Sequence, residues 1–168
     1  MLPEIEQHLV IIEDLMDHVG YYINGLSPDA LNWRPLEGSD NIETNSLAGL
    51  VTNIAGSNKK FMIQVIAGKS IERDRDAEFA TVATSAEELV TLLQDNKQQI
   101  REVLTPLRNE GLGRDVEMNN HKVSTRWVIM WMIEHTALHL GHMQLTYQMG
   151  HSGEAGASPG WFDEQRVG

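Results

Sequence analysis

The segment "LPEIEQHLVIIEDLMDHVGYYINGL", residues 2–26, carries apolar side chains at alternating spacings of three and four residues. These apolar positions are Leu2, Ile5, Leu9, Ile12, Met16, Val19, Ile23 and Leu26. Because an α-helix turns once every 3.6 residues, this spacing places all of them on one narrow face. The pattern therefore predicts a long amphipathic helix that buries a single apolar seam against other helices.

Three later segments repeat this pattern and also carry residues that begin and end helices. Ser85 and Glu88 form the pair of a capping box at the start of one segment. Ser124 precedes the last segment as a candidate N-cap, and Gly150 follows it where a helix is expected to end. The predicted seams are Leu47, Leu50, Ile54, Phe61 and Val65; Leu89, Leu93, Ile100, Val103 and Leu107; and Val128, Trp131, His135, Leu138, His142, Leu145 and Met149.

Four helices with narrow seams predict an all-α fold, a four-helix bundle with long inter-helix connections. The chain has 168 residues and is 41% hydrophobic, which suits one domain with a single core. We expect the bundle to occupy residues 1–150, with room for a short hairpin in the connection 108–123. Residues 151–168 form a Gly-rich tail, in which Trp161 and Phe162 are the candidates for packing against the bundle.

Composition narrows the range of partners and compartments. The net charge of −11 disfavours nucleic acid and acidic membrane surfaces, because binding either one requires clustered Lys and Arg. The absence of cysteine excludes disulfides, thiolate nucleophiles and cysteine-based zinc sites. The N-terminus resembles no secretory signal, and no run approaches the roughly 18 apolar residues of a membrane span. We expect a soluble, cytoplasmic protein.

The segment "EHTALHLGH", residues 134–142, places three histidines on the predicted seam of the last helix. His135 and His139 are four residues apart, so one cation can reach both imidazoles. His142 lies about 10 Å along the axis from His135 at 1.5 Å rise per residue, too far to share one ion with it. Two interpretations stay open here, a metal site and a set of hydrogen-bonded core histidines.

A metal held by this pair needs a third protein ligand from another helix. Asn53 lies at the edge of the second seam, where its amide is either a weak ligand or a partner in an interhelical hydrogen bond. His8 and His18 are alternatives on the first helix, and we expect both on solvated flanks. We also expect His121 and His151 to be exposed.

Three motifs together resemble the DinB/YfiT-like superfamily. They are "LSPDALNWRPLEG" at residues 26–38, "NSLAGLVTNIAG" at 45–56 and "HTALHLGHM" at 135–143, and the resemblance extends over the chain to about Met149. It implies a four-helix bundle with one longer crossover, often a homodimer. It also implies a divalent metal ion, zinc or nickel, held by one histidine of the second helix and two of the fourth.

Matched residue by residue, His135 and His139 take the positions of the two fourth-helix ligands. The position of the second-helix histidine is Asn53 in this sequence, so the implied metal set is Asn53, His135 and His139. His142 falls where many members carry glutamine. Members of the superfamily include metal-dependent thiol S-transferases and hydrolases, so the resemblance implies a small-molecule substrate, with a low-molecular-weight thiol as one candidate.

Three hypotheses for function follow. In the first, the chain is a metal-dependent transferase or hydrolase in which His142 or Glu134 transfers a proton. In the second, the bundle has lost its second-helix ligand and is a non-catalytic ligand-binding or interaction module. In the third, it is a scaffold whose Met and Trp residues, such as Trp127 and Trp131, pack a dimer.

Overall fold

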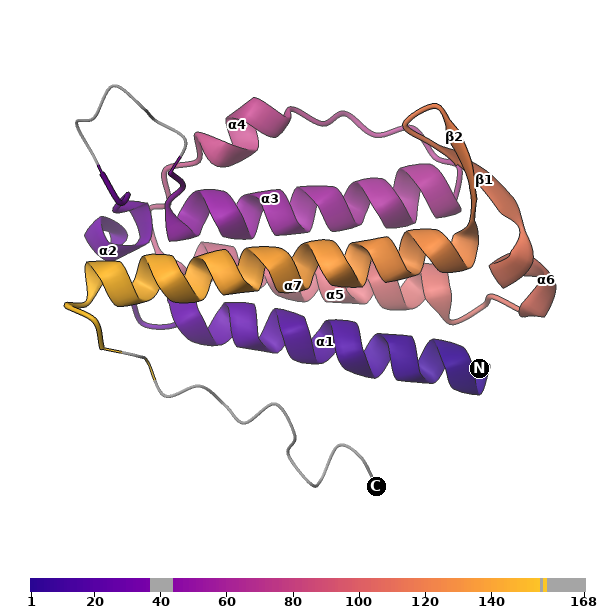
Figure 1. Ribbon diagram of the computed structural model, residues 1–168, viewed down its shortest axis with the longest axis horizontal. Coiled ribbons are helices and arrows are strands. Elements are labelled where there is room, and N and C mark those ends of the chain that lie inside the picture. Colours follow the sequence, from indigo (N-terminus) through magenta and orange to yellow (C-terminus); the bar gives the residue numbers. More distant parts are fainter. Residues whose placement is uncertain (37–43, 155, 157–168) are drawn as a thin grey trace.

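The computed structural model describes residues 1–36, 44–154 and 156 (Figure 1). Four long helices form the body of the protein. They are α1 (Pro3–Ile23), α3 (Leu47–Lys59), α5 (Ala86–Leu104) and α7 (Thr125–Gly150). The predicted all-α bundle is therefore confirmed. Trp161 and Phe162, the proposed anchors of the tail, lie outside the described residues.

The helices are arranged so that α1 and α7 run in one direction and α3 and α5 in the other (Figure 1). Contacts at both ends of the α1–α7 pair show their parallel course. Arg126 pairs with Glu4 near the two N-termini, and Tyr147 meets Tyr22 near the two C-termini. α1 also packs on α5, and α3 packs on both α5 and α7. The long crossover between α3 and α5 lets these two neighbours run in the same direction.

Short elements occupy the connections. They are α2 (Pro28–Asn32), the π-helix η1 (Lys60–Ile66) that continues α3, α4 (Arg75–Phe79), α6 (Asn109–Gly113), β1 (Asp115–Met118) and β2 (His121–Ser124). The two strands pair antiparallel and form the hairpin for which the sequence leaves room. Asn119 and Asn120 both have positive φ in its two-residue turn, a conformation that asparagine tolerates well.

The core follows the predicted seams along α1, α3 and α5. Ile5, Leu9, Ile12, Met16 and Val19 of α1 are all buried. The predicted caps are confirmed as well. The Ser85 hydroxyl accepts from the Glu88 N–H, and the Ser124 hydroxyl accepts from the Trp127 N–H. Within the described part of the chain, no helix is long and apolar enough to cross a membrane.

The predicted seam of α7 was wrong over most of its length. Trp131, Leu138, Leu145 and Met149 are exposed, as is His142. Val128 of the predicted seam is buried. The other buried positions were not predicted: they are Ile129, Met132, Leu140 and Met143, with Thr125, Thr136 and Thr146. The apolar residues of α7 cover almost its whole circumference, so spacing alone did not identify the face that packs.

The predicted flank position of His18 was also wrong. His18 is buried, and its Nδ1 lies 2.8 Å from the backbone oxygen of Asp14. This hydrogen bond to the preceding helical turn gives Nδ1 a partner, so the imidazole can be buried without leaving that nitrogen unpaired. His18 therefore lies inside the bundle, and His121 is exposed as predicted.

The crossover returns along α3, with α4 lying directly on that helix (Figure 1). Two glycines of α3 make the close approach possible. A Cβ atom at Gly49 would lie 2.9 Å from the backbone oxygen of Phe79, and one at Gly56 would lie 1.9 Å from Oε1 of Glu78. Both positions therefore need glycine for packing.

We predict that Gly49→Ala destabilises the fold by about 1–3 kcal/mol, because the added methyl group pushes against backbone that cannot rotate away. Gly141→Ala is the matched control, since a Cβ at this other helical glycine meets nothing within 4 Å. In the control, the free energy of unfolding should rise by about 0.5–1 kcal/mol, because alanine has a higher helix propensity than glycine. Urea denaturation measures both changes. A stabilised Gly49→Ala variant would show that α4 does not pack on α3 in this way.

Candidate functional site

The two candidate ligands of α7 lie together between aromatic side chains. His135 and His139 are one turn apart, with ring centroids separated by 4.5 Å and ring planes inclined by 73°. Phe61 of η1 lies edge-on to His135 at 6.0 Å, and Phe79 of α4 lies 6.2 Å from His139. Both imidazoles are half-buried. The sequence therefore located the histidine pair correctly.

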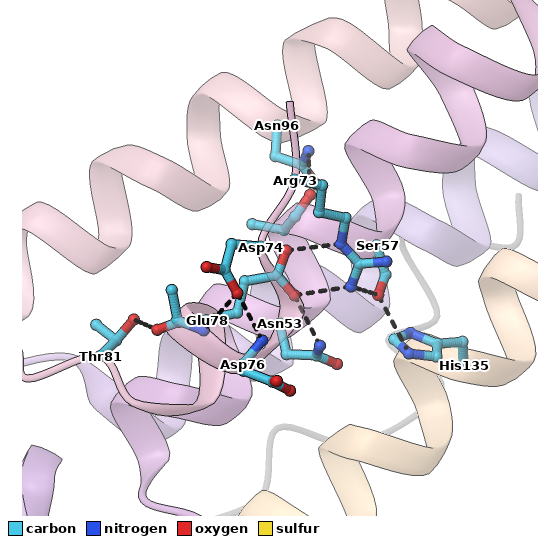
Figure 2. A network of polar contacts seen from close by, with 11 residues as sticks. Asn53, Ser57, Arg73, Asp74, Asp76, Glu78, Thr81, Asn96 and His135 are labelled. Carbon is cyan, nitrogen blue, oxygen red and sulfur yellow. Dashed lines mark hydrogen bonds and ion pairs between the residues drawn. The ribbon is translucent and has the colours of Figure 1, made fainter. Parts of the chain in front are cut away.

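A polar network on α3 and the crossover faces His135 (Figure 2). Its centre is the carboxylate of Glu78, which is only 8% exposed. Arg73 donates to both carboxylate oxygens, from Nε and Nη2, each at 2.7 Å. Asn53 donates from Nδ2 to Oε2 of the same carboxylate at 2.8 Å. Because an ionised carboxylate only accepts, the amide nitrogen of Asn53 must be the atom that faces Glu78.

Ser57 connects this network to the histidines. Its hydroxyl accepts from Nη2 of Arg73 at 2.8 Å and lies 3.4 Å from Nε2 of His135. Ser57 follows Asn53 by one helical turn, so both side chains point to the same side of α3. Ser57, and not Asn53, is the α3 residue that meets His135.

Burial and local charge keep both imidazoles neutral at pH 7. Burial is the main cause that lowers the pKa of His135 to about 4, and the charges of His139, Arg73 and Arg75 add to it. Burial likewise lowers the pKa of His139 to about 4, helped by His142 and Arg75. Among the described residues, neither Nδ1 atom has a hydrogen-bond partner, although both are buried.

The residues of this site do not match a three-ligand metal centre. His135 and His139 are adjacent imidazoles, and the part of the chain described contains no group of three His, Cys, Asp or Glu side chains that could hold a metal ion. Asn53, the predicted third ligand, is 1% exposed; its amide nitrogen donates to Glu78, and its amide oxygen is a weak donor for zinc or nickel. The donor set therefore lacks the third strong ligand that zinc or nickel requires.

His142, the predicted proton-transfer residue, lies at the outer edge of the site. Its ring centroid is 5.5 Å from that of His139, and its side chain is exposed. Glu134 is exposed too. The predictions of a solvated flank for His8 and an exposed position for His151 were wrong, because both are half-buried. His8 lies near the Glu4–Arg126 pair, and His151 stacks on Tyr147. The structure thus places none of these residues with the His135–His139 pair as a third ligand.

Sequence reasoning missed Ser57, Arg73 and Glu78. The i, i+4 spacing from Asn53 was a usable signal for Ser57. Arg73 and Glu78 lie in a charged connector, where side chains are normally solvated, and no local spacing connects them to α3. Gly56 was an indirect signal, because a helical glycine often marks a close approach.

A cleft lies beside the Arg73–Glu78 pair. This cleft of about 290 Å³ runs between α3, α5 and residues 71–74. Asn96 and Gln99 line this cleft, and their amide oxygens, Oδ1 and Oε1, are buried without a hydrogen-bond partner among the described residues. Asp95 lines the same cleft, as do Lys59 and Arg73. The lining therefore includes residues that can accept hydrogen bonds from a ligand.

Comparison with known protein families places this geometry in context. The family model of the DinB superfamily matches residues 12–143, which cover all four long helices in whole or in part. The chain belongs to the DinB superfamily. No curated protein matches the chain. This member of the DinB superfamily has the bundle fold and the histidine pair of α7. Its α3 carries Asn53 where the resemblance implies a third histidine.

We predict that the folded chain loses stability as the pH falls from about 6.5 toward 4. Both histidines have a folded pKa of about 4 against an ordinary value of 6.5, so the unfolded chain binds more protons in this range. Urea denaturation midpoints at pH 7 and pH 5 measure the loss. The double variant His135→Gln/His139→Gln should lose less stability between pH 7 and pH 5. His121→Gln, which changes an exposed histidine, should lose as much stability as the natural chain. An equal loss in the double variant would contradict the assignment.

Proposed function

We propose that this DinB-superfamily chain is a small-molecule-binding bundle that does not use a three-ligand metal site. The observation that carries the proposal is the hydrogen bond from Asn53 to Glu78, whose carboxylate is also held by two bonds from Arg73. A buried carboxylate with three donors is a satisfied group, so the network is complete without an ion. Metal-dependent transferase or hydrolase activity, which the family resemblance implies, stays a prediction.

The ligand is expected in the cleft beside the network. The unpaired acceptors of the cleft residues Asn96 and Gln99, together with Asp95, favour a molecule that presents several N–H donors. A protonated primary amine has three such donors and a charge that matches Asp95. A donor that bonds these buried acceptors removes the cost of leaving them unsatisfied. We therefore propose a small amine as the class of ligand.

Metal content tests the first part of this proposal. We predict that the chain, purified without a metal-affinity tag, contains far less than one zinc or nickel ion per molecule, and that a chelator leaves its melting temperature unchanged. Elemental analysis and thermal denaturation measure these quantities. Stoichiometric metal that is lost in His139→Ala would contradict the proposal and favour the metal-dependent enzyme.

Asn53→His should raise zinc affinity by more than about tenfold, because it supplies the third imidazole. Even outer-shell partners of a metal site change affinity 10–100-fold. The matched control is the double variant Asn53→His/His139→Ala, which has the new histidine but only two imidazoles and should lose the gain. An equal gain in both variants would show that the new histidine binds zinc away from the α7 pair.

Ligand class is tested by thermal shift. We predict that short alkyl diamines raise the melting temperature of the chain more than diols of the same length, which lack the positive charge. Gln99→Leu should reduce the diamine effect, because it removes one acceptor from the cleft wall without touching the Asn53–Glu78–Arg73 network. A diamine effect that is equal in Gln99→Leu, or matched by the diols, would exclude this cleft as an amine site.

A further inference from the structure

A second cavity lies between α2 and the C-terminal end of α7, which are neighbours in the fold (Figure 1). Its volume is about 320 Å³. It shares no lining residue with the cleft beside Arg73 and Glu78, and neither His135 nor His139 lines it. The cavity is therefore separate from both the histidine site and the proposed amine site.

Three aromatic side chains line this cavity, those of Trp33, Tyr147 and His151. The ring of Tyr147 stacks on His151, with centroids 3.9 Å apart, and lies edge-on to Tyr22 at 5.5 Å. The indole of Trp33 packs on α7 where a glycine leaves room, since a Cβ atom at Gly150 would lie 3.2 Å from its Cε3. Packing within the chain thus holds the aromatic rings in place, which lowers the ordering cost of binding a ligand.

The charges around the cavity favour a cation. Among the described lining residues, Asp29 is the only Asp, Glu, Lys or Arg. The 26-residue helix α7 ends here without a basic residue in its last turn, so its own side chains leave the partial negative charge of the helix end in place. At the start of α2, the Ser27 hydroxyl already accepts from the Ala30 N–H, which is therefore not offered to an anion.

The polar groups of the lining narrow the kind of cation. Nδ1 of His151 lies 2.8 Å from the backbone oxygen of Tyr147, and a carbonyl only accepts, so Nδ1 carries the proton and the neutral ring has a lone pair at Nε2. A primary ammonium group has three N–H donors, each of which needs an acceptor when it leaves water. A methylated ammonium group has fewer donors or none, and its charge is attracted to the faces of aromatic rings. A lining of three aromatic rings and one carboxylate therefore suits the methylated group better.

We propose that the cavity between α2 and α7 binds a small organic cation that carries a methylated ammonium group. Trp33 and Tyr147 supply the aromatic surface, and Asp29 supplies the opposite charge. The cleft between α3 and α5 differs from this cavity, because its buried amide oxygens favour a ligand with N–H donors. The inference goes beyond the proposed amine binding and does not depend on it.

Isothermal titration calorimetry on the full chain tests the class of ligand with a matched pair of probes. The first is choline, and the second is its uncharged analogue dimethylbutanol, in which a tert-butyl group replaces the trimethylammonium group. We expect choline to bind at least about fivefold more tightly, because only the charged probe is attracted to the aromatic rings and to Asp29. Equal affinity for the two probes, or no binding of choline, would overturn the proposal.

Variants test the location of the site. Asp29→Asn, which changes an exposed residue and should leave the fold intact, should lower the affinity for choline about two- to fivefold and leave that for dimethylbutanol unchanged. Trp33→Leu should remove the preference for choline, whereas the matched control Trp127→Leu, near the N-terminal end of α7, should keep it. Gln99→Leu, in the cleft between α3 and α5, should keep it too. A preference that survives both Asp29→Asn and Trp33→Leu, or that is lost in Gln99→Leu, would overturn the proposal.

Discussion

The carboxylate of Glu78 joins parts of the chain that would otherwise be independent. It sits in the space that Gly56 leaves on α3, and it is bonded to Asn53 on the same helix and to Arg73 on the crossover. The crossover and α4 are held against α3 in this way, and Phe79 of α4 reaches the ring of His139. A buried ion pair contributes little net stability after desolvation, but losing one partner is costly, so it specifies a position more than it stabilises the fold.

The same interaction sets the chemical character of the site. It engages the amide of Asn53 and, through Arg73 and Ser57, reaches Nε2 of His135. Burial, helped by the charges of His139, Arg73 and Arg75, lowers the pKa of His135 and keeps it neutral at pH 7. The position for which the family resemblance implies a metal ligand, Asn53, belongs to a hydrogen-bonded network in this chain.

The helix α7 contributes one face to the site and another to solvent. His135 and His139 point toward α3 and α4, whereas Trp131 and Leu138 point outward. Its inward face contains threonines as well as aliphatic residues, and Thr136 bonds back to the oxygen of Met132. A threonine that bonds its own helix can be buried at low cost, so threonines do not prevent this face of α7 from packing.

The sequence by itself determined the four helices, the N-caps Ser85 and Ser124, and the seams of α1, α3 and α5, because these depend on local spacing and on residues within one turn. It also located the histidine pair, since four residues on a helix always share a face. Only the tertiary structure decided which face of α7 is buried and that Glu78, 25 residues from Asn53 in the chain, engages its amide. Such contacts form only when the crossover folds back on α3. The residue pattern of a single segment cannot predict which distant segment will pack against it.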